Sequence, residues 1–287
     1  MTPVALALVL LSAVAHASWN LCAKRAGGGA RFIWLFEALA SLLYAPLALY
    51  VIAVQRPHLG ALGVAFLAGS VLLHLAYFLI LQRGYSVGDL SLVYPLARGT
   101  GPTLSTAAAI AFFGERPSPL AIVGALLVAI SVVILVGGPR LARGAGGAGW
   151  AVGYGLLTGV VIAAYTLWDK RAVSALLIPP ILLNWSNDLG RALLLLPLAL
   201  RGKEAVRDLW RAHWQETLGV AILSPLAYLL VLTALVFTPV SYVAPAREVS
   251  ILIGALMGTR LLSEGDAPRR LVAAGAMVLG VVALALG

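Results

Sequence analysis

Ten apolar stretches follow one another along these 287 residues, with little else between them. A helix needs about 20 such residues to cross roughly 30 Å of hydrocarbon, so ten crossings use about 200 positions. Lipid offers no partner to backbone polar groups, and the stretches lack the alternation of barrel strands, so each is predicted to be a helix. Charged, Gly and Pro residues bound the stretches, which lie at Pro3–Cys22, Phe32–Val54, Gly60–Leu81, Leu90–Phe113, Leu120–Val136, Trp150–Trp168, Ile178–Leu200, Thr217–Phe237, Val240–Leu262 and Leu271–Leu286.

The composition disfavours most other classes of protein. Hydrophobic residues make up 61% of the chain and charged residues 11%, with a mean hydropathy of +0.99, whereas a soluble domain is about half apolar and a quarter charged. Soluble enzymes, nucleic-acid binders and disulfide-stabilised secreted domains are therefore poor candidates. The net charge of +9 is spread over short loops, where basic residues meet anionic headgroups. We expect membrane lipid as a partner and no nucleic acid.

The two halves of the chain resemble each other. AKRA at 23–26 ends the first stretch and DKRA at 169–172 ends the sixth, while LAY at 75–77 in the third stretch returns at 226–228 in the eighth. The same 17 positions separate Arg98 from Glu115 and Arg247 from Glu264. These matches predict two five-helix repeats, at 1–137 and 150–287, joined by a Gly-rich linker at 138–149.

An odd number of helices in each repeat has a consequence for topology. The second repeat must enter the membrane from the opposite side, which makes an all-α inverted repeat around a central cavity. This arrangement lets a site at mid-depth face either surface in turn. Topology alone therefore favours transport.

The residues also resemble a known family. The sequence HASWN at 16–20, the two five-helix halves, and the acids Glu115 and Glu264 after the fourth and ninth stretches resemble the EamA-type members of the drug/metabolite transporter superfamily. Within it, the bacterial aromatic amino acid exporters are the most similar group. The resemblance implies ten helices in the inner membrane, a cavity lined by helices one to four and six to nine, and cytoplasmic termini.

Loop charge points to the other orientation. Four Lys and Arg residues lie on the side shared by the termini and thirteen lie on the opposite side. The positive-inside rule then places both termini outside the cytoplasm. We follow the orientation that the family implies.

Six Asp, Glu and Arg side chains lie inside the apolar stretches and away from their ends, where each costs several kcal/mol unless it is paired or wetted. Three are basic and three are acidic, which favours internal pairing over a charged pathway. Asp188 and Arg191 are three positions apart on one helix face and can pair with each other. Arg98 and Arg247 have two interpretations, as gate ion pairs with Glu37 or Glu248, or as anchors for a substrate carboxylate. The predicted set of gate or intramembrane ion pairs is Glu37, Arg98, Asp188, Arg191 and Glu248.

Aromatic and hydroxyl side chains share helix faces at intervals of three and four residues. Such faces suit an amphipathic small molecule, because rings stack and a few polar groups orient the ligand. The alternative for each is helix packing or interface anchoring. The predicted substrate-binding residues are His16, Trp19, Asn20, Tyr77, Tyr94, Tyr165, Tyr242 and Arg247.

Helix-breaking residues occupy matching places in the fourth and ninth stretches. Interrupted helices at corresponding positions indicate the site or hinges of a transporter, although ordinary proline kinks are also common. The predicted hinge residues are Pro95, Gly99, Gly101 and Pro245.

The chain carries no enzyme, nucleotide-binding or metal-binding motif. We expect no cofactor, no metal and no catalytic residue. The sequence favours a secondary transporter, acting as a monomer, that exports small amphipathic metabolites, above all amino acids including aromatic ones. Two alternatives stay open: a broad-specificity drug or cation exporter, and a protein of another class such as an intramembrane enzyme or a lipid-handling scaffold.

Overall fold

The computed structural model describes residues 1–27, 29–57, 59–87, 90–136, 148–253 and 267–287, and within these ranges it contains helices and no strand. Most of the predicted linker, and the end of the predicted ninth stretch, lie outside the described residues. The helices are α1 (Pro3–Arg25), α2 (Ala30–Gln55), α3 (Ala61–Val87), α4 (Leu90–Phe113), α5 (Pro119–Val136), α6 (Ala148–Ser174), α7 (Pro180–Arg201), α8 (Lys203–Phe237), α9 (Val240–Ala246) and α11 (Ala267–Leu286).

The outer surface of the bundle is apolar, as expected of a chain that lipid surrounds. Large side chains such as Leu42, Phe112 and Leu286 are more than two-thirds exposed. Five helices, namely α1, α2, α3, α6 and α8, are long and apolar enough to cross a membrane, and shorter apolar runs lie within α5 and α11. The chain is a multi-pass membrane protein.

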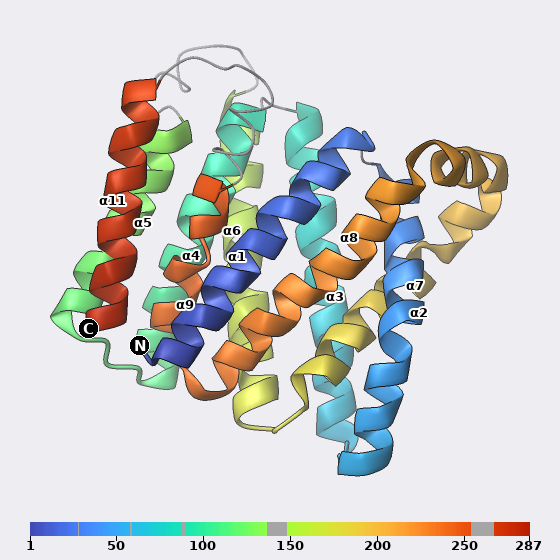
Figure 1. Ribbon diagram of the computed structural model, residues 1–287, viewed down its shortest axis with the longest axis horizontal. Helices are drawn as coiled ribbons and strands as arrows, with labels where there is room; N and C mark the ends of the chain where they lie inside the picture. The colour runs from blue at the N-terminus through green and yellow to red at the C-terminus, as the bar shows by residue number, and fades with distance from the viewer. Residues whose placement is uncertain (28, 58, 88–89, 137–147, 254–266) are drawn as a thin grey trace.

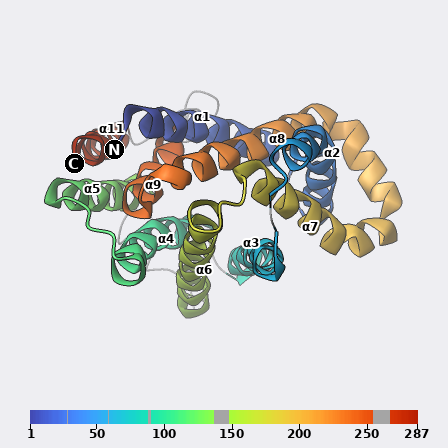
Figure 2. The same ribbon diagram turned by 90° about the horizontal axis from the view of Figure 1, so that it is seen from below.

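The helices pack in pairs drawn from the two halves of the chain. The helix pairs in close contact include α1 with α8, α3 with α6, α2 with α7, and α5 with α11. Figure 2 shows α1 and α8 along one side of the molecule and α3, α4 and α6 along the other, with α5 and α11 together at one edge.

Both ends of the chain lie together at the same end of the bundle (Figure 1). The Met1 amine donates a hydrogen bond of 3.1 Å to the Ala285 carbonyl oxygen. We call this end of the bundle the terminal face and the other end the opposite face. Ends that share one face require an even number of membrane crossings.

The predicted hinges differ between the two halves. Helix α4 continues without a break through Pro95, Gly99 and Gly101, and their role as hinges stays a prediction. Gly101 packs closely against α6, because a Cβ there would lie 2.7 Å from Ile162 Cγ2. Near Pro245 the expected break is present: α9 ends at Ala246, a turn follows at 247–248, and the chain is helical again at 249–253.

Helix α8 bends near its start. His213 has non-helical backbone angles (φ −135°, ψ 34°), so the segment 203–212 takes a different direction from the long helix that follows. Figure 1 shows this segment projecting from the bundle at the opposite face. Trp210 and Trp214 are 40% and 48% exposed, as in an amphipathic helix that lies along the membrane interface.

Helices α5 and α11 approach closely because glycines face each other. A Cβ on Gly280 would lie 2.8 Å from the Gly124 carbonyl oxygen, and a Cβ on Gly124 would lie 2.6 Å from that of Gly280. Small residues of this kind let membrane helices pack backbone to backbone.

Replacement of Gly280 by Ala is expected to lower the free energy of unfolding by about 1–3 kcal/mol, because the backbone of α5 leaves no room for the methyl group. Gly275→Ala in the same helix is the matched control, since no atom lies within 4 Å of its Cβ position. Thermal unfolding in detergent measures both variants. Equal midpoints would contradict the packing described here.

Candidate functional site

A cavity of about 420 Å³ lies among α1, α2, α3, α7 and α8, and Arg98 of α4, Tyr165 of α6 and Arg247 also line it. Its volume is within the range of small-molecule sites, about 300–1,000 Å³. Mid-helix residues line its inner part, including Ser12 of α1, His74 of α3 and Asn187 of α7. The cavity thus brings polar groups of both halves of the chain together at the depth of the hydrocarbon.

The cavity extends to the opposite face of the bundle. Lys24 at the end of α1, Gly29 before α2 and Tyr85 near the end of α3 line its outer part, and all three lie where these helices reach that face. No residue of α1 before Ser12, and none of α8 after Val231, is among the described lining residues. The cavity therefore stops short of the terminal face.

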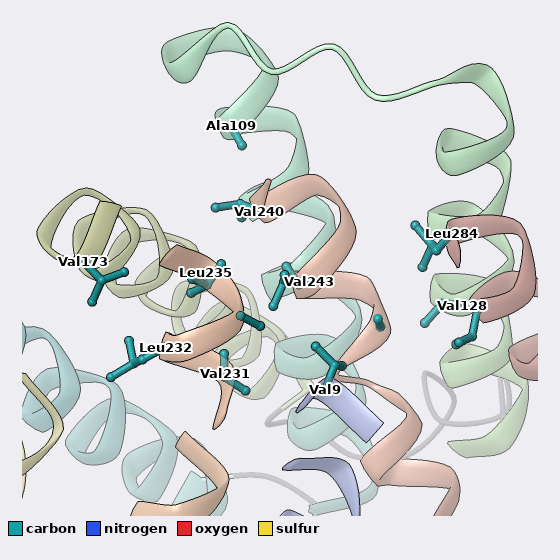
Figure 3. Packing of buried hydrophobic residues seen from close by; sticks show 14 of the residues in the cluster. Val9, Ala109, Val128, Val173, Val231, Leu232, Leu235, Val240, Val243 and Leu284 are labelled. Carbon is teal, nitrogen blue, oxygen red and sulfur yellow. The ribbon is translucent and has the colours of Figure 1, made fainter. Parts of the chain in front are cut away.

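Buried apolar side chains fill the bundle between the cavity and the terminal face. Val9 of α1, Leu235 of α8 and Val243 of α9 are each 1% exposed or less and belong to one core cluster. Figure 3 shows these residues with Val173 of α6 and Val231 of α8, on helices that converge from both halves. This cluster excludes water from the terminal end of the site.

Two charged side chains fix the turn between α8 and α9 beside this core. The Glu115 carboxylate accepts hydrogen bonds from the backbone amides of Val240 (2.8 Å) and Ser241 (2.9 Å) at the start of α9. The Lys170 ammonium donates to the carbonyl oxygens of Leu235 (2.7 Å) and Thr238 (3.0 Å) at the end of α8. Such charges satisfy backbone groups that helix ends leave unpaired.

Most of the predicted substrate-binding residues line this cavity. They are His16, Trp19, Asn20, Tyr77, Tyr165 and Arg247. The aromatic rings are in mutual contact: the Tyr165 ring stacks on His74 with centroids 4.2 Å apart, and Tyr77 meets Tyr165 edge to face at 5.8 Å. The cavity wall is thus largely aromatic on its α3 and α6 side.

Two predicted binding residues are not placed there. Tyr242 is absent from the described lining residues; its hydroxyl accepts a hydrogen bond from the Ser118 amide (3.4 Å) and donates one to the Gly287 carbonyl (3.2 Å). The short helix α9 begins at the terminal face, so its first turn points away from the cavity. The side chain of Tyr94 lies outside the described residues.

One wall of the cavity carries two acids and one base. The Arg191 guanidinium lies 2.9 Å from Asp188 Oδ1 and 3.2 Å from Glu37 Oε2. Asp188 and Arg191 thus pair within α7 as their spacing indicates, and Glu37 of α2 joins them rather than either of the other two arginines. Two carboxylates against one guanidinium leave one negative charge, which a proton or a cationic ligand group can balance.

A second ion pair joins the fourth helix to the turn after α9. Arg98 Nη1 lies 3.6 Å from Glu248 Oε1, and Arg98 Nη2 donates to His16 Nε2 at 3.0 Å. Glu248 is buried and is not among the described lining residues of the cavity. His16 is thus held as an acceptor, in the neutral form that has its proton on Nδ1.

Arg247 differs from Arg98, its counterpart in the repeat. Its guanidinium carbon lies 5.8 Å from the centre of the Tyr228 ring, and it lines the cavity. None of the described residues forms an ion pair with it. Arg247 thus places a guanidinium at the inner end of the cavity.

Sequence reasoning missed a buried polar cluster next to the cavity. Asp169 of α6 is 0% exposed, and its carboxylate accepts from Ser70 Oγ (2.5 Å), pairs with His74 Nε2 (2.9 Å) and accepts from the Tyr228 hydroxyl. Asn187 Nδ2 of α7 donates to Ser70 Oγ at 3.0 Å. We call Asp169, Ser70, His74, Tyr228 and Asn187 the Asp169 cluster.

A signal for this cluster was present in the sequence. The predicted sixth stretch ends at Trp168, because the charged residues DKR at 169–171 mark the end of an apolar run. Helix α6 continues to Ser174, so Asp169 lies inside the bundle. Where the first half has Ala23, the second half has this acid.

These features define an all-helical, multi-pass membrane protein with a polar and aromatic central cavity. Residues 149–286 match the model of the EamA-like transporter family, a range that coincides within one residue at each end with the second predicted repeat. The second half of the chain is thus similar to the EamA-like transporter family.

The fold has relatives among solved structures. One, described only as a crystal structure of a protein, covers 100% of this chain and 98% of its own, with a TM-score of 0.80 and 13% identity. In all, 29 chains of solved structures match. At such low identity the likeness concerns the fold alone. No curated protein matches the sequence.

Replacement of Arg191 by Gln is expected to destabilise the protein by about 3 kcal/mol, because it leaves Glu37 and Asp188 buried without their base. Thermal unfolding in detergent measures the change. The control is Arg201→Gln, an exposed arginine at the end of the same helix. A midpoint for Arg191→Gln as high as that of the control would show that the acids do not depend on Arg191.

Proposed function

We propose that the protein is a secondary transporter of the inner membrane that exports small amphipathic metabolites, above all amino acids including aromatic ones. The single observation that carries the proposal is the charge pattern of the cavity. An acid-rich group (Glu37, Asp188 and Arg191) and an arginine without an ion pair among the described residues (Arg247) line one aromatic chamber.

This pattern complements an amino acid with an apolar side chain. The planar guanidinium of Arg247 suits the α-carboxylate, which it can bind through two parallel hydrogen bonds. The surplus carboxylate of Glu37 and Asp188 suits the α-ammonium group. Tyr77, Tyr165 and Trp19 offer ring faces and edges to the side chain of the substrate.

The inverted repeat that the sequence predicts would support movement of such a solute. The packing of α1 on α8 corresponds to that of α6 on α3 when the two halves exchange roles, and α2 with α7 and α5 with α11 are pairs of corresponding helices. In the alternating-access mechanism that we propose, the state described here opens at the opposite face. Rocking of the halves then closes that face and opens the apolar core at the terminal face.

The orientation in the cell belongs to the same proposal. With cytoplasmic termini, as the family resemblance implies, the cavity described here faces outward, as it does when an exporter releases its substrate. Fluorescent and periplasm-active tags fused to each terminus check the orientation. Both termini in the periplasm would favour the orientation that loop charge indicates.

Binding of three related ligands tests the proposed recognition. Phenylalanine carries both charged groups, phenethylamine lacks the carboxylate and 3-phenylpropionate lacks the ammonium group. Purified protein is expected to bind phenylalanine most tightly. Arg247→Gln is expected to weaken phenylalanine binding by about 10-fold or more, the loss of one charge-assisted interaction, and to leave phenethylamine binding unchanged.

The control for this series is Arg201→Gln, which is exposed and remote from the cavity. Exchange of radiolabelled phenylalanine across liposomes that contain the protein then shows whether binding leads to transport. Equal effects of Arg247→Gln on all three ligands would contradict a carboxylate anchor. Absence of any exchange would contradict transport of this substrate class.

The acid-rich group also favours a second candidate, a broad drug or cation exporter. Glu37 and Asp188 outnumber Arg191 there, and a surplus buried acid attracts a cation. In that case a quaternary amine is transported and phenylalanine is not. Parallel uptake of phenylalanine, threonine and a quaternary amine separates the two functions.

A further inference from the structure

The Asp169 cluster has no part in the recognition of substrate described above. Asp169 is not among the described lining residues of the cavity, whereas His74 and Tyr228 are. A buried carboxylate inside a membrane helix is costly and marks a functional role by default. We propose that Asp169 binds and releases a proton and thereby couples solute movement to a proton gradient. The inference rests on the proposed transport function.

The cluster holds together helices of both halves. Ser70 and His74 come from α3 and Tyr228 comes from α8, and each hydrogen-bonds to the carboxylate of α6. Asn187 extends the cluster to α7 through Ser70. On the terminal side, Trp168 Nε1 donates to the Phe66 carbonyl (2.8 Å) and the two rings stack at 4.2 Å. The cluster thus lies at the inner edge of the closed terminal end.

The nearby arginine and lysine side chains are bound to other groups, so the cationic partner of Asp169 among the described residues is a histidine. His74 is the one described side chain that forms an ion pair with it, and it does so only when protonated. Arg191 is bound to Glu37 and Asp188, Lys170 to backbone carbonyls, and Arg98 to His16 and Glu248. Among the ionisable groups on the elements packed against α6 are His74 and Tyr77 (α3), Arg98 (α4), Asp188 and Arg191 (α7), Tyr228 (α8), Arg247 and Glu248 (after α9), with Tyr165 and Lys170 on α6 itself.

A path for the proton leads from the cavity to Asp169. His74 lines the cavity, and its Nε2 lies 2.9 Å from Asp169 Oδ2 and 3.2 Å from the Tyr228 hydroxyl. A proton from cavity water can therefore reach the carboxylate through the imidazole, because one ring nitrogen can accept a proton while the other releases one. No bond other than those to the proton forms or breaks.

Protonation changes what the carboxyl group can do. As a carboxylate, Asp169 only accepts, and all three donors of α3 and α8 find an acceptor. As a carboxylic acid it must donate its own proton, so one of the three hydrogen bonds that it now accepts from Ser70, His74 and Tyr228 is lost. The charged form therefore stabilises the closed terminal end, and the protonated form loosens it. When that end opens, the proton can leave to the terminal side.

The residues that correspond to Asp169 and Tyr228 in the first half of the chain do not form the same hydrogen bond. The repeat aligns Asp169 with Ala23 and Tyr228 with Tyr77, and Ala23 and Tyr77 line the cavity toward the opposite face. Alanine cannot accept a hydrogen bond from that tyrosine through its side chain. Among the described residues, the buried carboxylate that bridges α3, α6 and α8 therefore lies at the terminal end and has no acidic counterpart at position 23 of the first half.

Transport of radiolabelled phenylalanine in liposomes, with and without a pH gradient, tests the inference. With the membrane potential clamped at zero, one proton per solute gives the wild type an accumulation of about tenfold per pH unit, since one pH unit and a tenfold ratio are the same free energy. Asp169→Asn is expected to abolish this accumulation and the accompanying pH change in the lumen, while phenylalanine exchange without a gradient is retained.

Two further variants separate coupling from a structural role. Asp208→Asn changes an exposed acid of α8 and is expected to behave as the wild type. Ser70→Ala removes one donor but keeps the acid, so gradient-driven accumulation is expected to remain. Parallel loss of exchange and accumulation in both Asp169→Asn and Ser70→Ala would overturn the inference, because it would show that the cluster only holds helices together.

Measurements on the wild type distinguish failure of proton coupling from failure of the proposed transport function. Exchange without any response to a pH gradient would overturn proton coupling and leave the transport function intact. Absence of exchange at every pH would contradict the transport function itself.

Discussion

Charged side chains can lie at the depth of the hydrocarbon only where other charges, hydrogen-bond donors or water compensate them. This constraint accounts for the arrangement of the bundle interior. Arg191 joins α2 to α7 through Glu37 and Asp188, Arg98 joins α4 to the turn after α9 through Glu248, and Asp169 joins α6 to α3 and α8. Four of these groups, namely Glu37, Asp188, Arg191 and Arg98, also line the central cavity, so they contribute both to the stability of the bundle and to the polarity of the site.

The two ends of the bundle are built differently. Toward the terminal face, valine and leucine side chains of α1, α8 and α9 pack without a path for solute, and Glu115 and Lys170 fix the turn that closes this end. Toward the opposite face the cavity is lined by the ends of α1 and α3. A change of access has to separate the apolar core at one end and bring helices together at the other.

Much of this arrangement could be predicted from residue patterns, because helices in lipid follow hydrophobicity closely. The predicted stretch Leu90–Phe113 has the bounds of α4, and a period of 3.6 residues places His16, Trp19 and Asn20 on the cavity face of α1. Partner choice could not be predicted: nothing in the order of residues indicates that Glu37 binds Arg191 rather than Arg98. The burial of Asp169 could not be predicted, because a run of charged residues usually marks the end of a membrane helix, whereas α6 continues to Ser174.

The hydrogen bond between Met1 and Ala285 has a consequence for chain connectivity. Because the first and last residues are neighbours, a short peptide could join them, and new ends could be cut between α5 and α6. In such a circular permutant the EamA-like half would be synthesised first, and both new termini would lie at the opposite face. We expect the packing of the two halves to be independent of their order in the chain.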